Sequence, residues 1–230
     1  MIKLLCPNKN QFSNEIKNLL PKHINFELKE LSQKQFNKIF FKYEIIMLRF
    51  GLFLPFKKQS KIKYIISPTT GTNHISKKYF SKKEIKIITL KNEYKFLKNV
   101  RATIELTILL ILLSLRNYYL IGKKNHILTK EIYQKKIGII GYGRIGKAVN
   151  KYLSNFGAKI FINDKKKNIV PKINFKNLKY ILQNCDILTF HIPLDKKTYN
   201  IFNKKKLSYI KKNAIIINTS RGEIFNEHHL

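Results

Sequence analysis

The stretch KKIGIIGYGRIGKAVNKYLSNFGAKIFINDKKK, residues Lys135–Lys167, decides the fold. It begins with an apolar run, Lys136–Ile140, that is typical of a buried strand. The turn Gly141–Gly146 follows with the spacing GxGxxG and opens an amphipathic helix over Arg144–Phe156. A second apolar strand then leads to Asp164, 18 residues after the last glycine of the turn. The glycine pattern alone is weak, but this order of elements predicts a βαβ unit that binds a dinucleotide.

Each residue type in the turn has a physical role. Gly141 permits the tight strand-to-helix turn, Gly143 lets the backbone approach a pyrophosphate, and Gly146 lets the helix pack on the sheet. The start of the helix offers unpaired N–H groups and partial positive charge to the phosphates. Asp164 can accept hydrogen bonds from the ribose hydroxyls and would repel a 2′-phosphate, which favours NAD over NADP, although Lys165–Lys167 weaken that preference. The alternative is a βαβ unit whose glycine turn binds nothing.

The rest of the chain also alternates strands with helices. After the strand Lys159–Asn163 we expect helices over Phe175–Gln183 and Lys204–Lys211 and strands over Asp186–Phe190 and Ala214–Asn218. Such alternation predicts a doubly wound parallel sheet. The first 95 or so residues hold five further apolar runs, which we expect to be the strands of a separate small α/β domain: Ile2–Cys6, Ile24–Leu28, Glu44–Phe50, Lys63–Ser67 and Ile85–Leu90. The segments Asn10–Leu20 and Gln33–Phe41 could supply crossover helices.

The segment Val100–Tyr119 predicts a long helix that is apolar nearly all round at its centre, and therefore buried between layers or domains. Its most apolar part, Thr107–Leu115, has nine residues, whereas a membrane span needs about 20. The N-terminus lacks the pattern of a signal peptide. Cys6 and Cys185 lie far apart in apolar runs, which indicates a reducing cytoplasm with neither disulfides nor a metal cluster. We therefore expect a soluble, cytoplasmic protein.

The charge of +33 invites comparison with proteins that bind nucleic acid or anionic membranes. Lysine supplies 41 of the 46 positive residues, while isoleucine occurs 36 times, asparagine 23 times and alanine 4 times. A surface selected for phosphate would use more arginine, whose planar fork matches phosphate oxygens. Compositional drift is therefore the favoured interpretation, and a charge-driven function is the alternative. Without a recognised nucleic-acid-binding motif, we expect no specific nucleic-acid partner.

Two further strands end in polar segments, and ligands of open α/β sheets bind at the carboxyl ends of strands. One is CDILTFHIPL (residues 185–194), in which we interpret His191 as a structural histidine rather than a catalytic one. The other is NAIIINTSRGEIFNEHHL (residues 213–230), which contains Arg221, one of five arginines in the chain. Together with IGIIGYGRIGKAV, and with SPTTGTNHI at Ser67–Ile75, these segments resemble the D-isomer-specific 2-hydroxyacid dehydrogenase family.

The resemblance implies a flavodoxin-like substrate domain over residues 1–98 and a Rossmann NAD-binding domain, incomplete at its C-terminus, over residues 99–230. It implies hydride transfer between NAD(H) and a small 2-hydroxy or 2-oxo acid, and a homodimer. Arg221 matches the catalytic arginine that binds and polarises the substrate. Thr70, Gly71 and Thr72 match residues near the substrate. The implied cofactor contacts are Gly141, Gly143, Arg144, Ile145, Gly146, Asp164, Thr70, Ile192, Pro193, Thr219 and Ser220.

The sequence also departs from the family pattern. The family's long helix carries an Ala-Glu-His triplet, and here Glu105 matches the glutamate while Leu106 stands where histidine is usual. The family's general acid/base histidine and its glutamate lie further along the chain than Leu230, and His228 and His229 are interpreted as surface residues. The resemblance therefore implies a truncated chain with impaired turnover. The alternative is a catalytically inactive NAD-binding protein, or a half-enzyme that needs a partner chain.

Overall fold

The computed structural model describes residues 1–120 and 128–229. It divides into two compact units, Met1–Asn99 (unit 1) and Val100–Leu230 (unit 2). Each unit has its own parallel sheet and its own hydrophobic core.

Unit 1 is built on a five-stranded parallel sheet. Its strands are β1 (Ile2–Cys6), β2 (Ile24–Leu28), β3 (Ile45–Met47), β4 (Tyr64–Ser67) and β5 (Lys86–Thr89). All neighbouring strands are parallel, and the order is β2-β1-β3-β4-β5. This is the strand order of flavodoxin-like folds, so the predicted fold class is confirmed for this unit. The predicted strands are confirmed, with β3 much shorter than the apolar run that contains it.

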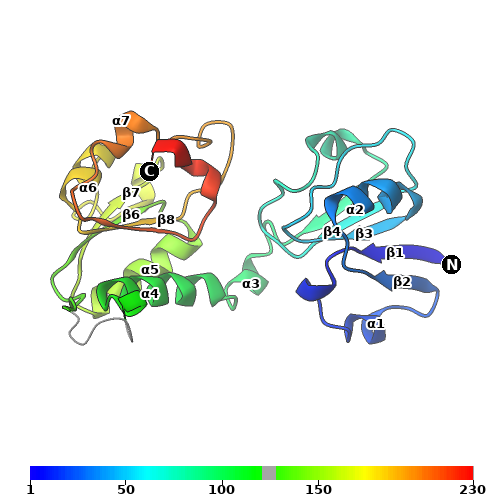
Figure 1. The fold of residues 1–230 in the computed structure, drawn as a ribbon, viewed down its shortest axis with the longest axis horizontal. Coiled ribbons are helices and arrows are strands. Elements are labelled where there is room, and N and C mark those ends of the chain that lie inside the picture. The colour runs from blue at the N-terminus through cyan, green and yellow to red at the C-terminus, as the bar shows by residue number, and fades with distance from the viewer. Residues whose placement is uncertain (121–127, 230) are drawn as a thin grey trace. The chain divides into compact units, whose positions relative to one another are not determined.

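Short helices cover both faces of this sheet. In Figure 1, α2 (Gln33–Ile39) and α1 (Ile16–Leu19) lie on opposite faces. A capping box, in which Ser32 and Gln35 bond to each other's backbone N–H, begins α2. The predicted helix over Asn10–Leu20 is wrong in extent, because only a 3-10 turn and the single turn α1 form there. The Ser13 hydroxyl accepts a hydrogen bond from the Glu15 N–H, and such local side-chain bonds compete with a continuous helix.

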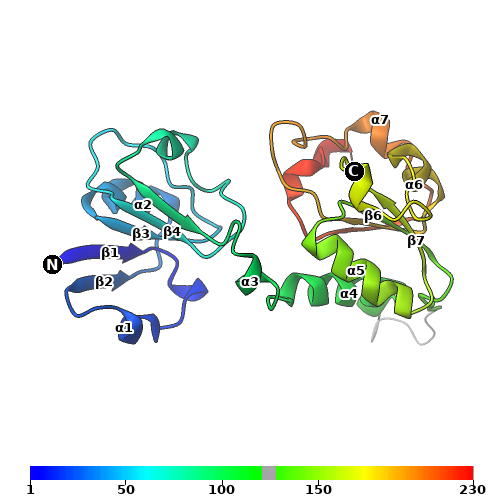
Figure 2. The same ribbon diagram turned by 180° about the vertical axis from the view of Figure 1, so that it is seen from behind.

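Unit 2 is built on a four-stranded parallel sheet. Its strands are β6 (Lys136–Ile140), β7 (Lys159–Asn163), β8 (Ile187–Phe190) and β9 (Ile215–Asn218), in the order β7-β6-β8-β9. The helices α4 (Ala102–Leu115) and α5 (Arg144–Asn155) cover one face, and α6 (Leu178–Asn184) and α7 (Lys204–Leu207) cover the other, as Figures 1 and 2 show. Two apolar clusters fill the two sides of the sheet. The predicted doubly wound arrangement is confirmed.

The strand order creates a switch point at β6. From β6 the chain crosses to β7 on one side and later returns to β8 on the other side of the same strand. The connections after β6 and β8 therefore diverge at the carboxyl end of the sheet, where open α/β sheets bind ligands. Beyond β7, a single parallel bridge between Ile162 and Phe175 extends the sheet.

The long apolar helix differs from its prediction. It spans Ala102–Leu115 rather than Val100–Tyr119, and only one of its faces is buried. Ile104 and Ile111 pack in the core, but the side of Leu106 and Leu109 is about half exposed, at 48% and 51%. The prediction of burial all round is wrong, because within unit 2 the helix packs on α5 and β9 from one side.

The predicted helix Lys204–Lys211 is also shorter in the structure, where it ends at Leu207. The Ser208 hydroxyl donates to the Lys205 carbonyl and the Lys211 N–H bonds to the Leu182 carbonyl, which takes the chain away from the helix axis. The remaining helical turns are short: α3 (Tyr94–Leu97) and the 3-10 turns Lys9–Gln11, Phe40–Lys42, Lys77–Ser81, Tyr118–Leu120, Lys167–Ile169, Gly222–Ile224 and Glu227–His229. Among the described residues, none of the helices is long and apolar enough to cross a bilayer.

Candidate functional site

The glycine turn lies at the switch point of unit 2. Gly141 has φ +98°, a conformation that favours glycine, and its N–H bonds to the Asn163 carbonyl at 2.8 Å. A Cβ at Gly141 would stand 2.6 Å from the carbonyl oxygen of His191, and a Cβ at Gly146 would overlap the carbonyl oxygen of Gly141. Both positions therefore require glycine for packing, because strand β8 and helix α5 press against the turn.

Gly143 has the opposite environment. It is exposed, it is the N-cap residue immediately before α5, and a Cβ built on it would meet nothing within 4 Å. Packing inside the protein therefore does not explain glycine at this position. An open backbone at the start of a 12-residue helix fits close approach by a pyrophosphate, since the first N–H groups of a helix bind anions. The residues present thus fit the predicted dinucleotide.

Asp164 lies beside this turn, immediately after β7. Its Oδ2 accepts a hydrogen bond from the Tyr142 N–H at 2.7 Å, and its Oδ1 accepts one from the Lys166 N–H at 2.7 Å. The carboxylate is therefore held in one orientation by the glycine turn and by its own loop. Each carboxylate oxygen can accept more than one hydrogen bond, so both retain capacity for ribose hydroxyls.

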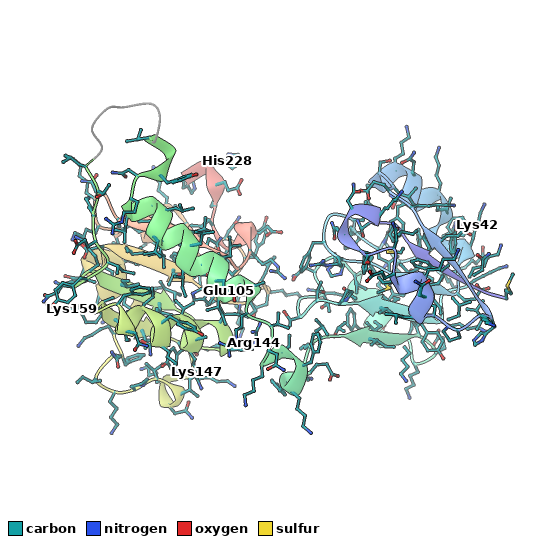
Figure 3. The ribbon with its side chains drawn as sticks, turned by 90° about the horizontal axis from the view of Figure 1, so that it is seen from below. Lys42, Glu105, Arg144, Lys147, Lys159 and His228 are labelled. Carbon is teal, nitrogen blue, oxygen red and sulfur yellow. The ribbon has the colours of Figure 1, made fainter. Side chains whose placement is uncertain are left out.

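Arg144 begins α5 and extends toward the start of α4. Its Nη1 donates to the Val100 carbonyl at 2.7 Å, and Figure 3 shows it beside α4, the helix that carries Glu105. Ile145, the next residue, packs its side chain against the core of unit 2. These two implied cofactor contacts thus have their side chains directed to α4 and to the core, respectively.

His191 follows β8 and contacts the glycine turn through its backbone. Its N–H donates to the Ile140 carbonyl at 2.7 Å, and its Nε2 lies 3.0 Å from the hydroxyl of the buried Thr189. Burial lowers the pKa of His191 from 6.5 to about 4, so the ring is neutral at neutral pH. These contacts fit the structural interpretation. Ile192 packs against the neighbouring apolar cluster, whereas Pro193 is exposed.

Arg221 follows β9 in a turn organised by Asn218. The Oδ1 of Asn218 accepts hydrogen bonds from the N–H and the hydroxyl of Ser220, at 3.0 and 2.7 Å, and its Nδ2 donates to the Arg221 carbonyl at 2.8 Å. The Arg221 Nη1 donates to the Ser220 carbonyl at 2.7 Å. The asparagine side chain therefore sets the backbone that carries Thr219, Ser220 and Arg221.

A hydroxyl pair connects this turn to α4. Thr107 is fully buried, and its hydroxyl donates to the Thr103 carbonyl at 2.7 Å. Its oxygen lies 2.9 Å from the Thr219 hydroxyl, 112 residues later in the chain. Because the Thr107 proton is already used, Thr219 must be the donor. Sequence reasoning missed Thr107, although a hydroxyl in the middle of an apolar helix was a signal.

The predicted substrate loop belongs to unit 1, whereas the other predicted site residues belong to unit 2. Thr70, Gly71 and Thr72 follow β4, with Thr70 exposed and the other two half-buried. Arg49 lies at the carboxyl end of the neighbouring β3. Its Nη1 donates to the Gln11 carbonyl at 3.3 Å.

A hollow of about 430 Å³ in unit 1 lies elsewhere. Lys61 and Lys63 line it just before β4, and Lys83 and Lys86 line it at the start of β5. It therefore lies at the amino ends of these strands, opposite the edge that carries Thr70. His228 is exposed, and Figure 3 shows it well apart from Arg144 within unit 2.

Comparison with known proteins agrees with this geometry. Residues 113–230 match the model of the D-isomer specific 2-hydroxyacid dehydrogenase NAD binding domain. The chain belongs to this family. The predicted resemblance is therefore confirmed, and NAD as the predicted cofactor agrees with the domain that the model describes.

Individual relatives cover more of the chain. It is 33% identical to erythronate-4-phosphate dehydrogenase of Wigglesworthia glossinidia brevipalpis, in a match that covers 75% of this chain and 43% of that protein. It is 28% identical to D-specific alpha-keto acid dehydrogenase of Enterococcus faecium, over 75% of this chain and 54% of that protein. The chain thus spans about half the length of these relatives.

Solved structures of two NAD-bound dehydrogenases share the fold. NAD⁺-bound 3-phosphoglycerate dehydrogenase of Entamoeba histolytica superposes with a TM-score of 0.79 at 20% identity, covering 99% of this chain and 74% of that one. NAD-bound formate dehydrogenase of Staphylococcus aureus gives 0.81 at 20% identity, covering 100% and 76%. At this identity the likeness establishes the fold alone.

Proposed function

We propose that unit 2 binds NAD(H) at the carboxyl edge of its sheet. The pyrophosphate would lie at the start of α5 over Gly143, and the adenosine ribose would hydrogen-bond to Asp164. The observation that carries this proposal is the pairing of an open Gly143 with a carboxylate fixed by the Tyr142 N–H. Further proposed cofactor contacts follow the ends of β8 and β9: Ile192, Pro193, Thr219 and Ser220.

We further propose that the whole protein is a D-2-hydroxyacid dehydrogenase that acts on a small 2-hydroxy or 2-oxo acid. The bound nicotinamide supplies or accepts the hydride. Arg221 is proposed to bind the substrate carboxylate and carbonyl, because a guanidinium matches a planar pair of oxygens with two parallel hydrogen bonds. Thr70, Gly71 and Thr72, in unit 1, are proposed as further substrate contacts. Family membership supports the reaction class.

The proposal is tested by measuring binding and turnover on the same purified protein. NADH binding is followed by fluorescence, and NADH oxidation is followed with a panel of 2-oxo acids that includes pyruvate and glyoxylate. The variant Arg221→Lys keeps the charge but loses the fork, and it should lower turnover at least tenfold with unchanged NADH affinity. Arg116→Lys, an exposed arginine at the end of α4, is the matched control and should behave as wild type.

The two functions predicted from the sequence separate in this assay. A protein that binds NADH but oxidises none with any 2-oxo acid would be an NAD-binding protein without turnover. A protein that does not bind NADH would contradict both.

We also propose that the protein is a cytoplasmic homodimer that uses the exposed side of α4. Leu106 and Leu109 leave an apolar strip there, and apolar surface of this kind marks interfaces. Sedimentation of the wild type and of Leu109→Arg should give a dimer and a monomer, respectively.

Burial raises the pKa of the Cys6 thiol to about 11 and that of Cys185 to about 12, which suits thiols kept reduced in the cytoplasm.

A further inference from the structure

Three polar side chains are buried together beneath the substrate loop of unit 1. Ser67 is 1% exposed, Thr69 is 6% exposed and His74 is 7% exposed. They bracket the exposed Thr70 in the chain. Buried polar groups are costly unless they are hydrogen-bonded, so the bonds among these three side chains decide how the loop is held.

The geometry determines which atom donates in each of these bonds. The Thr69 hydroxyl lies 2.7 Å from the Gly71 carbonyl, which can only accept, so Thr69 is the donor. The Ser67 hydroxyl lies 2.9 Å from the Thr69 oxygen, whose proton is already used, so Ser67 donates to Thr69. The Nε2 of His74 lies 2.8 Å from the Ser67 oxygen, whose proton is also used, so His74 donates from Nε2. The result is a one-directional chain from His74 through Ser67 and Thr69 to the Gly71 carbonyl.

Both ends of this chain are anchored by the backbone of unit 1. The His74 carbonyl accepts a hydrogen bond from the Leu54 N–H at 2.7 Å, and the Leu54 carbonyl accepts one from the Ser76 N–H at 3.0 Å. At the other end, the Thr69 carbonyl accepts one from the Leu90 N–H at 3.0 Å. The ring of Phe50 packs edge-on against His74, with 5.0 Å between centroids. The imidazole therefore has a fixed backbone and a fixed ring neighbour.

The chain sets the direction of one peptide group in the loop. In a planar trans peptide, the carbonyl of one residue and the N–H of the next point in opposite directions. Because the Gly71 carbonyl is turned inward to the buried Thr69 hydroxyl, the Thr72 N–H is turned outward. A backbone N–H held outward in this way is a preorganised donor for an anionic oxygen.

We propose that His74, Ser67 and Thr69 are positioning residues, whose directed hydrogen-bond chain holds the Gly71–Thr72 peptide so that the Thr72 N–H faces the carboxylate of the substrate. The orientation of the peptide follows from unit 1 alone, while the identity of the anion rests on the proposed function. The chain also requires His74 to be protonated on Nε2.

The first experiment tests the direction of the chain. Nitrogen-15 NMR of the imidazoles reports the tautomer of each histidine, and the His74 signals are assigned by their loss in His74→Asn. Wild type and Thr69→Ser should show His74 protonated on Nε2. In Thr69→Val the hydroxyl that accepts from Ser67 is lost, so Ser67 becomes free to donate to His74 and the Nε2–H preference should disappear. A wild-type His74 protonated on Nδ1 alone would overturn the proposal, as would an unchanged tautomer in Thr69→Val.

The second experiment tests the consequence for binding, with oxalate as the probe anion in the presence of saturating NADH. Thr69→Val should weaken oxalate binding about tenfold, because the Thr72 N–H is no longer held toward the anion and about one hydrogen bond to it is lost. Thr69→Ser keeps the hydroxyl and should bind oxalate as tightly as wild type. NADH affinity should change less than about twofold in both variants, since each lies in unit 1. Ser67→Ala, which removes the middle of the chain, should act like Thr69→Val and serves where Thr69→Val fails to fold.

The outcomes separate the two proposals. If wild type binds NADH and oxalate, and if Thr69→Val and Ser67→Ala bind oxalate as tightly, the positioning role is wrong and the proposed function stands. If wild type binds no NADH, the proposed function is wrong, and the tautomer result alone then decides whether the chain is directed as described. If wild type binds NADH but no oxalate, the positioning role is wrong.

Discussion

Two alanine substitutions three residues apart in the glycine turn should have opposite consequences. At Gly146, an added Cβ overlaps the carbonyl oxygen of Gly141, so the backbone of the turn or of α5 must move. At Gly143, an added Cβ meets nothing within 4 Å. The added methyl group therefore disturbs packing at Gly146, whereas at Gly143 it enters only the space proposed for the ligand.

The magnitudes follow from these environments. Overpacking against rigid structure costs about 1–3 kcal/mol, and the contact at Gly146 is with backbone, which yields less than a side chain. Gly146→Ala should therefore destabilise unit 2 by about 2–3 kcal/mol. Alanine is a slightly poorer residue than glycine at the start of a helix, so Gly143→Ala should cost less than about 1 kcal/mol. Its methyl group would stand where the pyrophosphate approaches, so NADH affinity should fall at least tenfold.

Amide hydrogen exchange read by mass spectrometry is the assay, because the two units serve as internal controls for each other. Since a factor of ten corresponds to about 1.4 kcal/mol, amides of β6 should exchange roughly 30- to 150-fold faster in Gly146→Ala. Amides of β1, in unit 1, should be unchanged. In Gly143→Ala both strands should exchange nearly as in wild type. Native protection of β6 in Gly146→Ala, or wild-type NADH affinity in Gly143→Ala, would refute the reasoning.

Three further predictions concern single side chains. Asp164→Asn should lower NADH affinity and reduce the preference for NADH over NADPH about tenfold, because the fixed carboxylate that repels a 2′-phosphate is lost. Parallel titrations with NADH and NADPH measure the ratio of the two affinities. An unchanged ratio would show that Asp164 does not contact the ribose. The pKa of His191 is about 4 in the folded state, below its value of 6.5 in the unfolded state. Between pH 6.5 and pH 4 the unfolded state therefore binds more protons, and the free energy of unfolding should fall by up to roughly 3 kcal/mol as the pH drops across that range. Urea unfolding across that range should show the loss in wild type and a smaller one in His191→Gln, and equal slopes would contradict the assignment. Thr107→Val removes the acceptor of the Thr219 hydroxyl and should cost about 1–2 kcal/mol in urea unfolding, with recovery in Thr107→Ser; a Val variant as stable as wild type would show that the buried pair contributes nothing.

Much of the fold could be predicted because its determinants are local and periodic. The apolar runs at β1, β2, β6 and β7 coincide with the observed strands from first residue to last. Strand β6, whose last four residues are buried, is apolar from Ile137 to Ile140, so its extent is visible in the sequence. Helix bounds were less accurate. At α1, the Ser13 hydroxyl accepts from the Glu15 N–H before the helix, which begins later than predicted. At α7, the Ser208 hydroxyl donates to the Lys205 carbonyl and the helix ends earlier than predicted. Hydrophobic patterning registers neither bond.

The sequence by itself determined the α/β class, the glycine turn and the acidic residue that follows it, because these depend on residue type at fixed spacing. Tertiary structure decided which glycine is required for packing and which leaves an open space, since that difference depends on what stands beside each one. It also decided that α4 exposes Leu106 and Leu109, that Thr107 meets Thr219, and that His74, Ser67 and Thr69 form one directed chain. Burial and hydrogen bonding depend on residues that are distant in the chain or that lie in irregular loops, where the sequence has no hydrophobic periodicity. They are therefore visible only in the folded structure.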